Sequence, residues 1–234
     1  MRAKERSPAL TDRYRTATDL PGMLPVFPLR GAILLPRASL TLNVFEPRYL
    51  ALVDHALAND RLVAVVQPAT DTGEDESPEG KSVPLRRIGC VGRITAFNEG
   101  DEDRLIISLS GVARFRLGEE ISSDTPFRMC DVDFSPYAMD FIPGHGEDDV
   151  DRPRLIETLR SYLEANHLNA DWDRINTANN ERLVNTLAIL SPYGPEEKQA
   201  LLEAEDLRTR AEALVALAEM ELATPDDGSG TSIQ

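Results

Sequence analysis

Residues Glu79-Gly80-Lys81-Ser82 look like the end of a phosphate-binding loop. Such a loop also requires a glycine five residues before Gly80, because its backbone N–H groups must cradle the phosphates. Position 75 is Asp75, so the pattern is broken, and the acidic side chains around it would repel a phosphate. We therefore predict that the chain has no nucleotide site.

A metal site needs clustered His, Cys or carboxylate ligands. His55, His145 and His167 stand far apart, and Cys90 and Cys130 do not form a C-x-x-C pair. We expect no metal and no cofactor. Because the N-terminus lacks the apolar segment of a secretory signal, we expect a cytoplasmic protein whose cysteines are reduced core thiols.

Nucleophilic catalysis needs an activated Ser, Cys or Thr with a base in reach. Ser108 and Ser110 lie on the polar side of an alternating segment with no His or Lys nearby. The acidic runs 99–103 and 147–151 lack the spaced ligands of a calcium loop. The sequence therefore predicts a protein that is not an enzyme.

The charge of the chain excludes further classes of function. It has 25 basic and 40 acidic residues and a formal net charge of −15. Nucleic-acid binding depends on neutralising phosphates, and an anionic membrane surface attracts basic segments, so neither partner is expected. No run of 18 apolar residues could span a membrane.

The N-terminal half reads as short strands with one early helix. Residues 1–22 are polar and predict a disordered tail. The apolar segment that follows is broken by Pro25, Pro28 and Pro36, so we expect short edge strands there. Residues 40–45 alternate as a strand does, the residues after Pro47 have a helical period, and residues 61–68 form a buried strand.

A long alternating segment is the clearest strand signal. Between residues 104 and 117 the apolar side chains share one parity, and Arg114 and Arg116 share the other with the serines. Gly111 near its middle indicates a bulge or bend. Strands are also expected at 88–97 and 127–134. Residues 23–135 thus predict a small, mostly antiparallel β-barrel with an inserted helix.

The C-terminal half has a helical period. Residues 136–150 have the composition of a linker. Residues 151–222 contain several amphipathic stretches and predict a helical bundle, and residues 223–234 predict a disordered tail. The expected fold class is therefore α+β, with a barrel followed by helices.

Several stretches of the chain resemble one family. They are "LPVFPLRGAILLP", "LTLNVFEPRYLALVD", "RLVAVVQP", "GCVGRITAF", "DRLIISLSGVARFRL" and "RLVNTLAILSPYGPEEKQALLEAEDLRTRAEAL". Together they look like the N-terminal, substrate-binding domain of the Lon protease family, over roughly residues 24–222. The resemblance implies a PUA-like β-barrel, a helical bundle, and recognition of protein substrates. Full Lon proteases append an ATPase module and a Ser–Lys peptidase module, and the 234 residues end before either. We therefore expect a stand-alone member of the family.

Arg48 lies in the first turn of the expected helix, where a cation opposes the helix dipole at a cost of about 0.3–1 kcal/mol. We expect it to be structural, with Glu46 and Arg48 as candidates for charge pairing. Residues two apart do not face each other on a helix, so Glu46 is not the obvious intrahelical partner. Arg48→Ala is expected to lower the melting temperature.

The expected function is binding of unfolded or extended polypeptides, at an exposed strand edge within 25–36 or in an apolar groove between barrel and helices. Phe27, Leu29, Arg30, Tyr49 and Tyr193 are the candidate groove residues, and core packing is the alternative for each. Further expected partners are a Lon protease in trans and a second copy in a weak homodimer. The alternative function is RNA or small-molecule binding by the barrel, for which Arg86, Arg87, Arg93, Arg114 and Arg116 offer a local basic patch.

Overall fold

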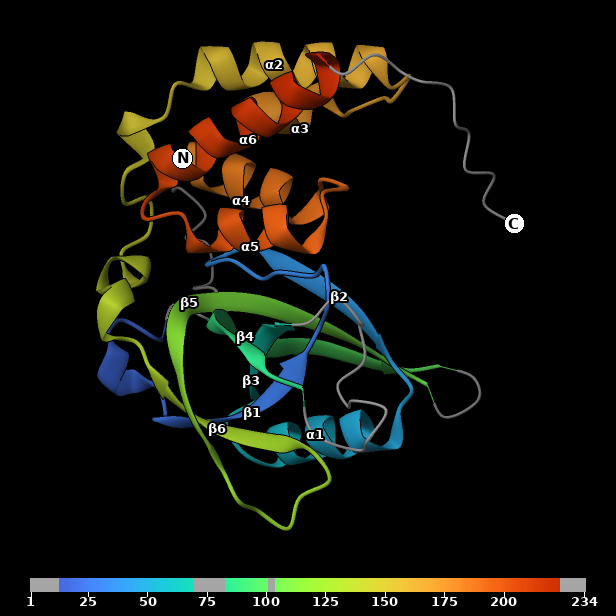
Figure 1. The fold of residues 1–234 in the computed structure, drawn as a ribbon, viewed down its shortest axis with the longest axis vertical. Coiled ribbons are helices and arrows are strands. Elements are labelled where there is room, and N and C mark those ends of the chain that lie inside the picture. Colours follow the sequence, from blue (N-terminus) through green and yellow to red (C-terminus); the bar gives the residue numbers. More distant parts are fainter. Residues whose placement is uncertain (1–12, 70–82, 101–103, 224–234) are drawn as a thin grey trace, which may run out of the picture.

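A mixed β-sheet forms one half of the molecule, and most of the helices lie together over one end of that sheet (Figure 1). The computed structural model describes residues 13–69, 83–100 and 104–223. The strands are β1 (Met23–Pro28), β2 (Ser39–Val44), β3 (Leu62–Pro68), β4 (Leu85–Glu99), β5 (Leu105–Ile121) and β6 (Arg128–Asp133). The α-helices are α1 (Pro47–Ala58), α2 (Arg152–Ala165), α3 (Trp172–Thr177), α4 (Asn180–Leu190), α5 (Pro195–Glu203) and α6 (Leu207–Ala223). Short 3-10 helices are η1 (Ala17–Asp19), η2 (Ser135–Phe141) and η3 (Glu147–Asp149).

The strand order is β2-β5-β4-β3-β1-β6, and β5 also pairs with β6, so the pairings close into a ring. Only β1 and β3 pair in parallel among the described strands. Antiparallel neighbours can be joined by tight turns, whereas a parallel pair needs a longer crossover. Here α1 lies in the crossover from β1 to β3 and covers the opposite end of the sheet from the other helices (Figure 1).

The expectation of an edge strand at the prolines is wrong for β1, which pairs on both sides. Met23 to Val26 pair with β6, and Val26 to Pro28 pair with β3. The two ladders overlap only at Val26. Pro25 is therefore paired only with β6, and Pro28 only with β3. On the unpaired side no N–H is needed, so a proline can be part of a strand that has neighbours on both sides.

Gly111 marks the expected bend in β5. Gly111 lies opposite Gly92 and Ala113 opposite Val91, so Val112 is an extra residue in β5. A Cβ atom at Gly111 would lie 2.0 Å from the carbonyl oxygen of Leu35. The segment before β2 can approach this closely only because residue 111 is a glycine. The N–H of Gly111 donates to the carbonyl of Ala38, and the carbonyl of Gly111 accepts from the N–H of Arg37.

The connection between the sheet and the helices is packed against β5 rather than loose. The segment expected as a linker, 136–150, contains η3 and most of η2, and it buries Asp140 and Phe141. Asp140 accepts hydrogen bonds from Arg114 of β5, and Phe141 packs on Phe134. Composition predicted a linker here, and two short helices provide local hydrogen bonds for its backbone.

The tail expected over residues 1–22 is also more structured than its composition suggests. Tyr14 and Leu20 are buried against the sheet, and η1 lies between them. Residues 1–12, 70–82, 101–103 and 224–234 lie outside the described residues, and the Glu79 to Ser82 motif falls among them. No helix in the described ranges combines the length and hydrophobicity of a membrane-spanning segment.

Candidate functional site

An apolar groove of about 460 Å³ opens among the C-terminal helices. α2, α4 and α6 contribute most of its lining, and α3 and the loops that follow α2 and α4 contribute the rest. Its lining is dominated by Leu155, Leu159, Tyr162, Leu163, Leu168, Ile175, Leu183, Leu187, Leu190, Tyr193, Leu214, Val215 and Ala218. No charged side chain lines it. A concave site of this size and chemistry is typical of a binding pocket.

The groove exists because the helical layer has more apolar surface than it can bury. On α2, Leu155 is buried, but Leu159 and Leu163 on the same face stay half-exposed. At the rim, the side chain of Leu168 is 53% exposed and that of Leu190 is 73% exposed. Contiguous exposed apolar residues on a hollow surface mark an interaction site more often than isolated ones do.

Uncharged polar side chains also line the groove, namely Thr158, Asn169, Thr186 and Ser191 besides two tyrosines. The two tyrosines are Tyr162 and Tyr193. Burial, followed by the charge of Glu221, raises the pKa of Tyr193. Burial, followed by the nearby carboxylate of Glu221, raises the pKa of Tyr162. Both hydroxyls therefore stay protonated and can donate hydrogen bonds.

Of the five predicted groove residues, only Tyr193 lines this groove. Phe27 and Tyr49 are buried and stack on each other with ring centroids 4.3 Å apart, as core residues do. Leu29 packs half-buried against the same core, and Arg30 is exposed beyond β1. The leucine-rich helical faces of α2 and α4 were the sequence signal for the groove, but periodicity does not say which of those leucines remain uncovered.

Glu46 and Arg48 do pair with each other. The Nε and Nη2 atoms of Arg48 donate to Glu46 Oε2 over 3.0 Å and 2.8 Å, and the guanidinium also lies over the Tyr49 ring. The expectation that Glu46 is not an obvious partner rested on both residues being helical. Glu46 is the N-cap with an extended backbone, so the helical spacing rule does not apply to it.

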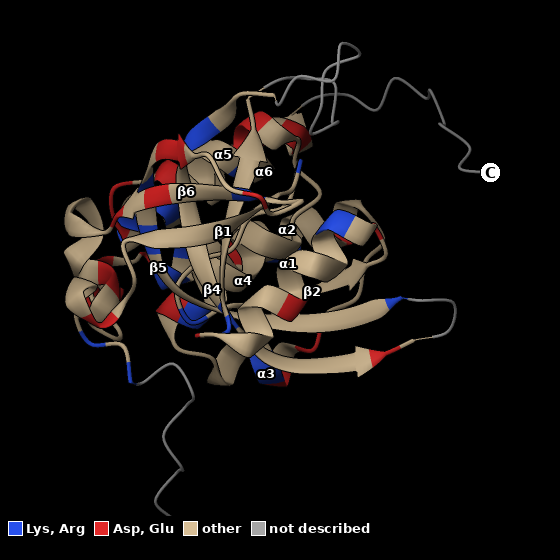
Figure 2. Cartoon of the chain, turned by 90° about the horizontal axis from the view of Figure 1, so that it is seen from below, with Lys and Arg blue, Asp and Glu red and all other residues tan. Residues whose placement is uncertain are grey.

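The arginines considered as an RNA patch are mostly engaged within the protein. Arg114 is buried against Asp140, Arg86 pairs with Glu196, and Arg93 donates to Tyr14 and to a main-chain carbonyl. Arg87 and Arg116 are exposed. Figure 2 shows acidic positions close to the basic ones around β5 and β6. Parity placed Arg114 on the polar side of β5, where Asp140 and the carbonyls of Leu202 and Ala204 bury its guanidinium group.

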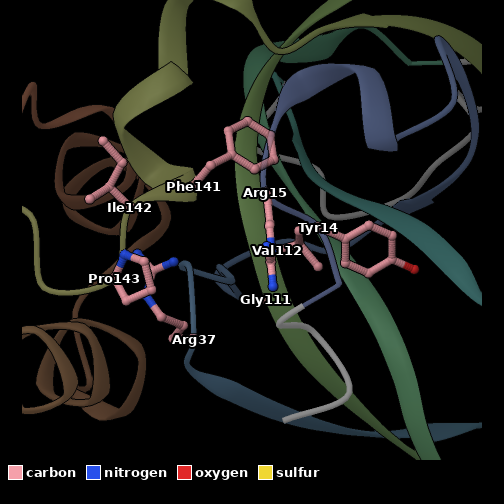
Figure 3. A pocket seen from close by; sticks show the side chains of 8 residues that line it. All are labelled: Tyr14, Arg15, Arg37, Gly111, Val112, Phe141, Ile142 and Pro143. Carbon is pink, nitrogen blue, oxygen red and sulfur yellow. The ribbon is translucent and has the colours of Figure 1, made fainter. Parts of the chain in front are cut away.

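A second hollow, of about 340 Å³, lies where the N-terminal segment and η2 meet β5. Figure 3 shows Arg15, Gly111 and Val112 between Tyr14 on one side and Arg37 and Pro143 on the other. The guanidinium of Arg37 is bound to both carboxylate oxygens of Glu181 and to the Asp140 carbonyl. Its charge is thus balanced inside the fold, which leaves the apolar groove as the better candidate.

Metal-ligating side chains do not gather into a binding group in the part of the chain that the structure describes. No set of three His, Cys, Asp or Glu side chains there could hold a metal ion. Cys90 and Cys130 are both buried free thiols, and burial raises the pKa of each. Such thiols are poor nucleophiles and metal ligands because the thiolate is disfavoured.

Comparison with known proteins identifies the family. Residues 23–219 match the model of the ATP-dependent protease La (LON) substrate-binding domain. The chain is 23% identical over 201 residues to a Lon protease of Flavobacterium johnsoniae, covering 82% of this chain and 23% of that protein. It is 30% identical over 109 residues to a Lon protease of Desulfosudis oleivorans, covering 47% of this chain and 13% of that protein. The matches therefore span less than a quarter of the length of these two relatives.

Solved structures share the fold. The crystal structure of a Lon N-terminal domain protein from Xanthomonas campestris superposes with a TM-score of 0.57 at 24% identity, covering 83% of this chain and 97% of that one. The N-terminal domain of a Lon protease from the Mycobacterium avium complex superposes with a TM-score of 0.63 at 17% identity, covering 84% and 98%. With the family model matching most of its length, this chain belongs to the LON substrate-binding domain family.

Proposed function

We propose that this protein is a non-catalytic module that binds unfolded or extended polypeptides, and that the apolar groove of the helical layer receives their side chains. The single observation that carries the proposal is an open groove lined by leucines and tyrosines, with Leu168 and Leu190 exposed at its rim. Burying such side chains against a partner is the main driving force of association.

The chemistry of the groove suits a polypeptide whose sequence is not fixed. An apolar wall accepts Leu, Ile, Phe or Met with little discrimination, because dispersion and water release are not directional. The two tyrosine hydroxyls can bond a main-chain carbonyl of the bound segment. Family membership supports the same function, because the family model that the chain matches is that of a substrate-binding domain.

The proposal includes the finer description of the fold. We infer that the closed ring of strands is a PUA-like β-barrel formed by residues 23–135, that residues 151–222 are the helical unit, and that the barrel supports the helical unit through Arg114 and Asp140. In this arrangement the barrel has a structural role and the helices bind. Binding of RNA by the barrel receives no support from its arginines, which are mostly paired.

A fluorescence-anisotropy titration with a labelled, reduced and carboxymethylated protein that cannot refold would test the proposal. Saturable binding is expected. Leu190→Ser should weaken it about tenfold, because burial of a leucine side chain contributes about 1.5–3 kcal/mol, not all of which is lost here. Phe97→Ser is the matched control, since Phe97 is also an exposed apolar residue, 50% exposed, but lies on β4 of the sheet.

Absence of saturable binding by the unmodified protein would refute the function. If Phe97→Ser weakened binding and Leu190→Ser did not, the function would stand but the groove would be the wrong site. Circular dichroism of each variant shows whether the fold is retained.

A further inference from the structure

We infer that the free edge of β2 binds an extended segment of an unfolded polypeptide as an additional strand, and that this segment carries apolar side chains at every second position. The inference rests on the proposed function and adds the conformation and the side-chain pattern of the bound segment. Among the described strands, β2 alone has a single neighbour, because the ring of pairings runs through the other five. The free edge that the sequence analysis expected within 25–36 therefore lies at residues 39–44.

The backbone of β2 presents hydrogen-bonding groups on its free side. The carbonyl of Ala38 accepts from the N–H of Gly111 over 2.9 Å, so the backbone groups of Ala38 face β5. These groups alternate in direction along an antiparallel strand, so those of Ser39, Thr41 and Asn43 face away from β5. No described residue forms a hydrogen bond with them on that side, and all three side chains are exposed. An extended segment can therefore pair with this edge through main-chain hydrogen bonds, whatever its sequence.

β2 lacks the features that protect most edge strands. Its sequence, Ser-Leu-Thr-Leu-Asn-Val, has neither a charged residue nor a proline, and its register with β5 is unbroken from residue 39 to residue 44. Natural edges are usually blunted by charges, prolines or bulges, because an unprotected edge pairs with other chains. β1, by contrast, contains two prolines although it has neighbours on both sides. The edge of β2 is thus suited to pairing.

The side chains of β2 determine which residues the bound segment presents. Leu40 and Leu42 pack against the core but are only half-buried. In an antiparallel addition, the residues opposite these two leucines form the pairs without hydrogen bonds, in which side chains lie closest together. Apolar residues at those positions would remove the leucines from water, whereas the residues opposite Ser39, Thr41 and Asn43 would lie on the polar, exposed side. The edge therefore fits a segment in which apolar and polar residues alternate.

Charge and length favour a different polypeptide over a second copy of this chain as the occupant. Two copies would each carry a formal net charge of −15 and would repel each other. The six residues of β2 span about 20 Å, whereas a stable protein–protein interface uses about 20–30 residues a side. Neither β2 nor the paired residues 105–110 of β5 have a charged side chain, so an uncharged segment meets no unpaired charge there.

The edge is also connected to the helical layer. Asn185 of α4 donates to the carbonyl of Pro36, just before β2, over 3.1 Å. β2 therefore starts beside α4, which also lines the apolar groove, and runs from there toward α1 (Figure 1). The edge would hold the main chain of the polypeptide, while the groove receives side chains.

Thr41→Pro tests the edge with the labelled carboxymethylated protein of the titration above. Proline removes the outward N–H of residue 41 and no N–H that bonds to β5, and an edge strand tolerates proline when the missing N–H faces solvent. Thr41→Pro should weaken binding at least about fivefold, because an acceptor of the bound segment loses its donor. Thr41→Val is the matched control, since it keeps the N–H and the branched shape of the side chain, and it should change binding less than about twofold.

Two peptides test the same edge on the unmodified protein, so that the result does not depend on the folding of a variant. Both are fluorescein-labelled and alternate leucine with threonine, and one is N-methylated on its threonines while the other is N-methylated on its leucines. With the leucines beside Leu40 and Leu42, the threonine N–H groups are those that bond to β2. Methylation of the threonines should therefore weaken binding at least about fivefold relative to methylation of the leucines.

The outcomes separate the two claims. If the unmodified protein does not bind the carboxymethylated protein, the proposed function fails and the inference fails with it. If it binds, but Thr41→Pro has no effect or Thr41→Val weakens binding equally, the function stands and strand addition at β2 is overturned. Equal binding of the two methylated peptides, or no binding of either, also overturns it. If analytical ultracentrifugation shows that Thr41→Pro converts a dimer into a monomer, the edge pairs two copies and the inferred occupant is wrong.

Discussion

Removal of the Asp140 carboxylate should destabilise the protein more than any surface change. Arg114 of β5 donates to Asp140 through its Nε over 2.9 Å, its Nη2 over 2.8 Å and its backbone N–H over 2.9 Å. The two side chains are only 5% and 9% exposed. Burial by itself lowers the pKa of Arg114, but the hydrogen bond and the charge of Asp140 raise that pKa above its ordinary value.

In Asp140→Ala the guanidinium would stay buried without its counter-ion. Its remaining partners are neutral, chiefly the carbonyls of Leu202 and Ala204. Breaking a buried pair by removing one partner costs about 3–5 kcal/mol of unfolding free energy. For a chain of this size each kcal/mol shifts the melting temperature by about 2–4 °C, so a fall of roughly 6–20 °C is expected.

Urea denaturation followed by circular dichroism measures this difference directly. Asp140→Asn keeps one acceptor and should lose less than Asp140→Ala. Asp124→Ala is the matched control, because Asp124 is exposed, and its free energy of unfolding should change by less than about 0.5 kcal/mol. A loss below about 1 kcal/mol for Asp140→Ala would refute the reasoning, since it would mean that the buried charge finds water or another partner.

Two further predictions concern stability. Arg48→Ala removes the ion pair with Glu46 and the contact with the Tyr49 ring, both of which are partly exposed. We expect a loss of about 1 kcal/mol of unfolding free energy, measured as a melting temperature about 2–4 °C lower. A melting temperature that does not change, like that of the control Arg87→Ala, would contradict a structural role. Burial raises the pKa of Cys130 from 9.0 to about 11, so the folded state keeps a proton that the unfolded chain releases. The contribution of the protonated Cys130 thiol to the free energy of unfolding is therefore complete below pH 9 and is lost as the pH rises toward 11. Urea unfolding between pH 8 and 11 should show that the free energy of unfolding falls with pH, and Cys130→Ala should reduce that slope by up to one proton. An unreduced slope would exclude this thiol as its source.

Local rules account for most of the elements. Pro47 opens α1 because its missing N–H would be unpaired there, and the helical period of the apolar residues after it predicts the buried face of that helix. Alternation predicted β5, and Gly111 predicted its bend. These signals lie within a few residues of each other, so sequence suffices to read them.

The groove could be predicted only in part. Tyr193 was a candidate, and the leucines of α2 and α4 have a clear helical period. Phe27 and Tyr49 have the same apolar character, yet they stack in the core. An apolar side chain is more stable when it is removed from water, but whether another element covers it depends on contacts between residues far apart in the chain.

The sequence by itself determined the types of the elements, the acidic balance of the helical half and the family resemblance. The tertiary structure alone decided which faces meet: that β1 pairs on both sides, that Arg114 is buried against Asp140, and that the leucine face of α2 is only partly covered. The physical reason is that propensity and periodicity act over one or two turns, whereas burial and charge pairing are set by packing across the whole chain.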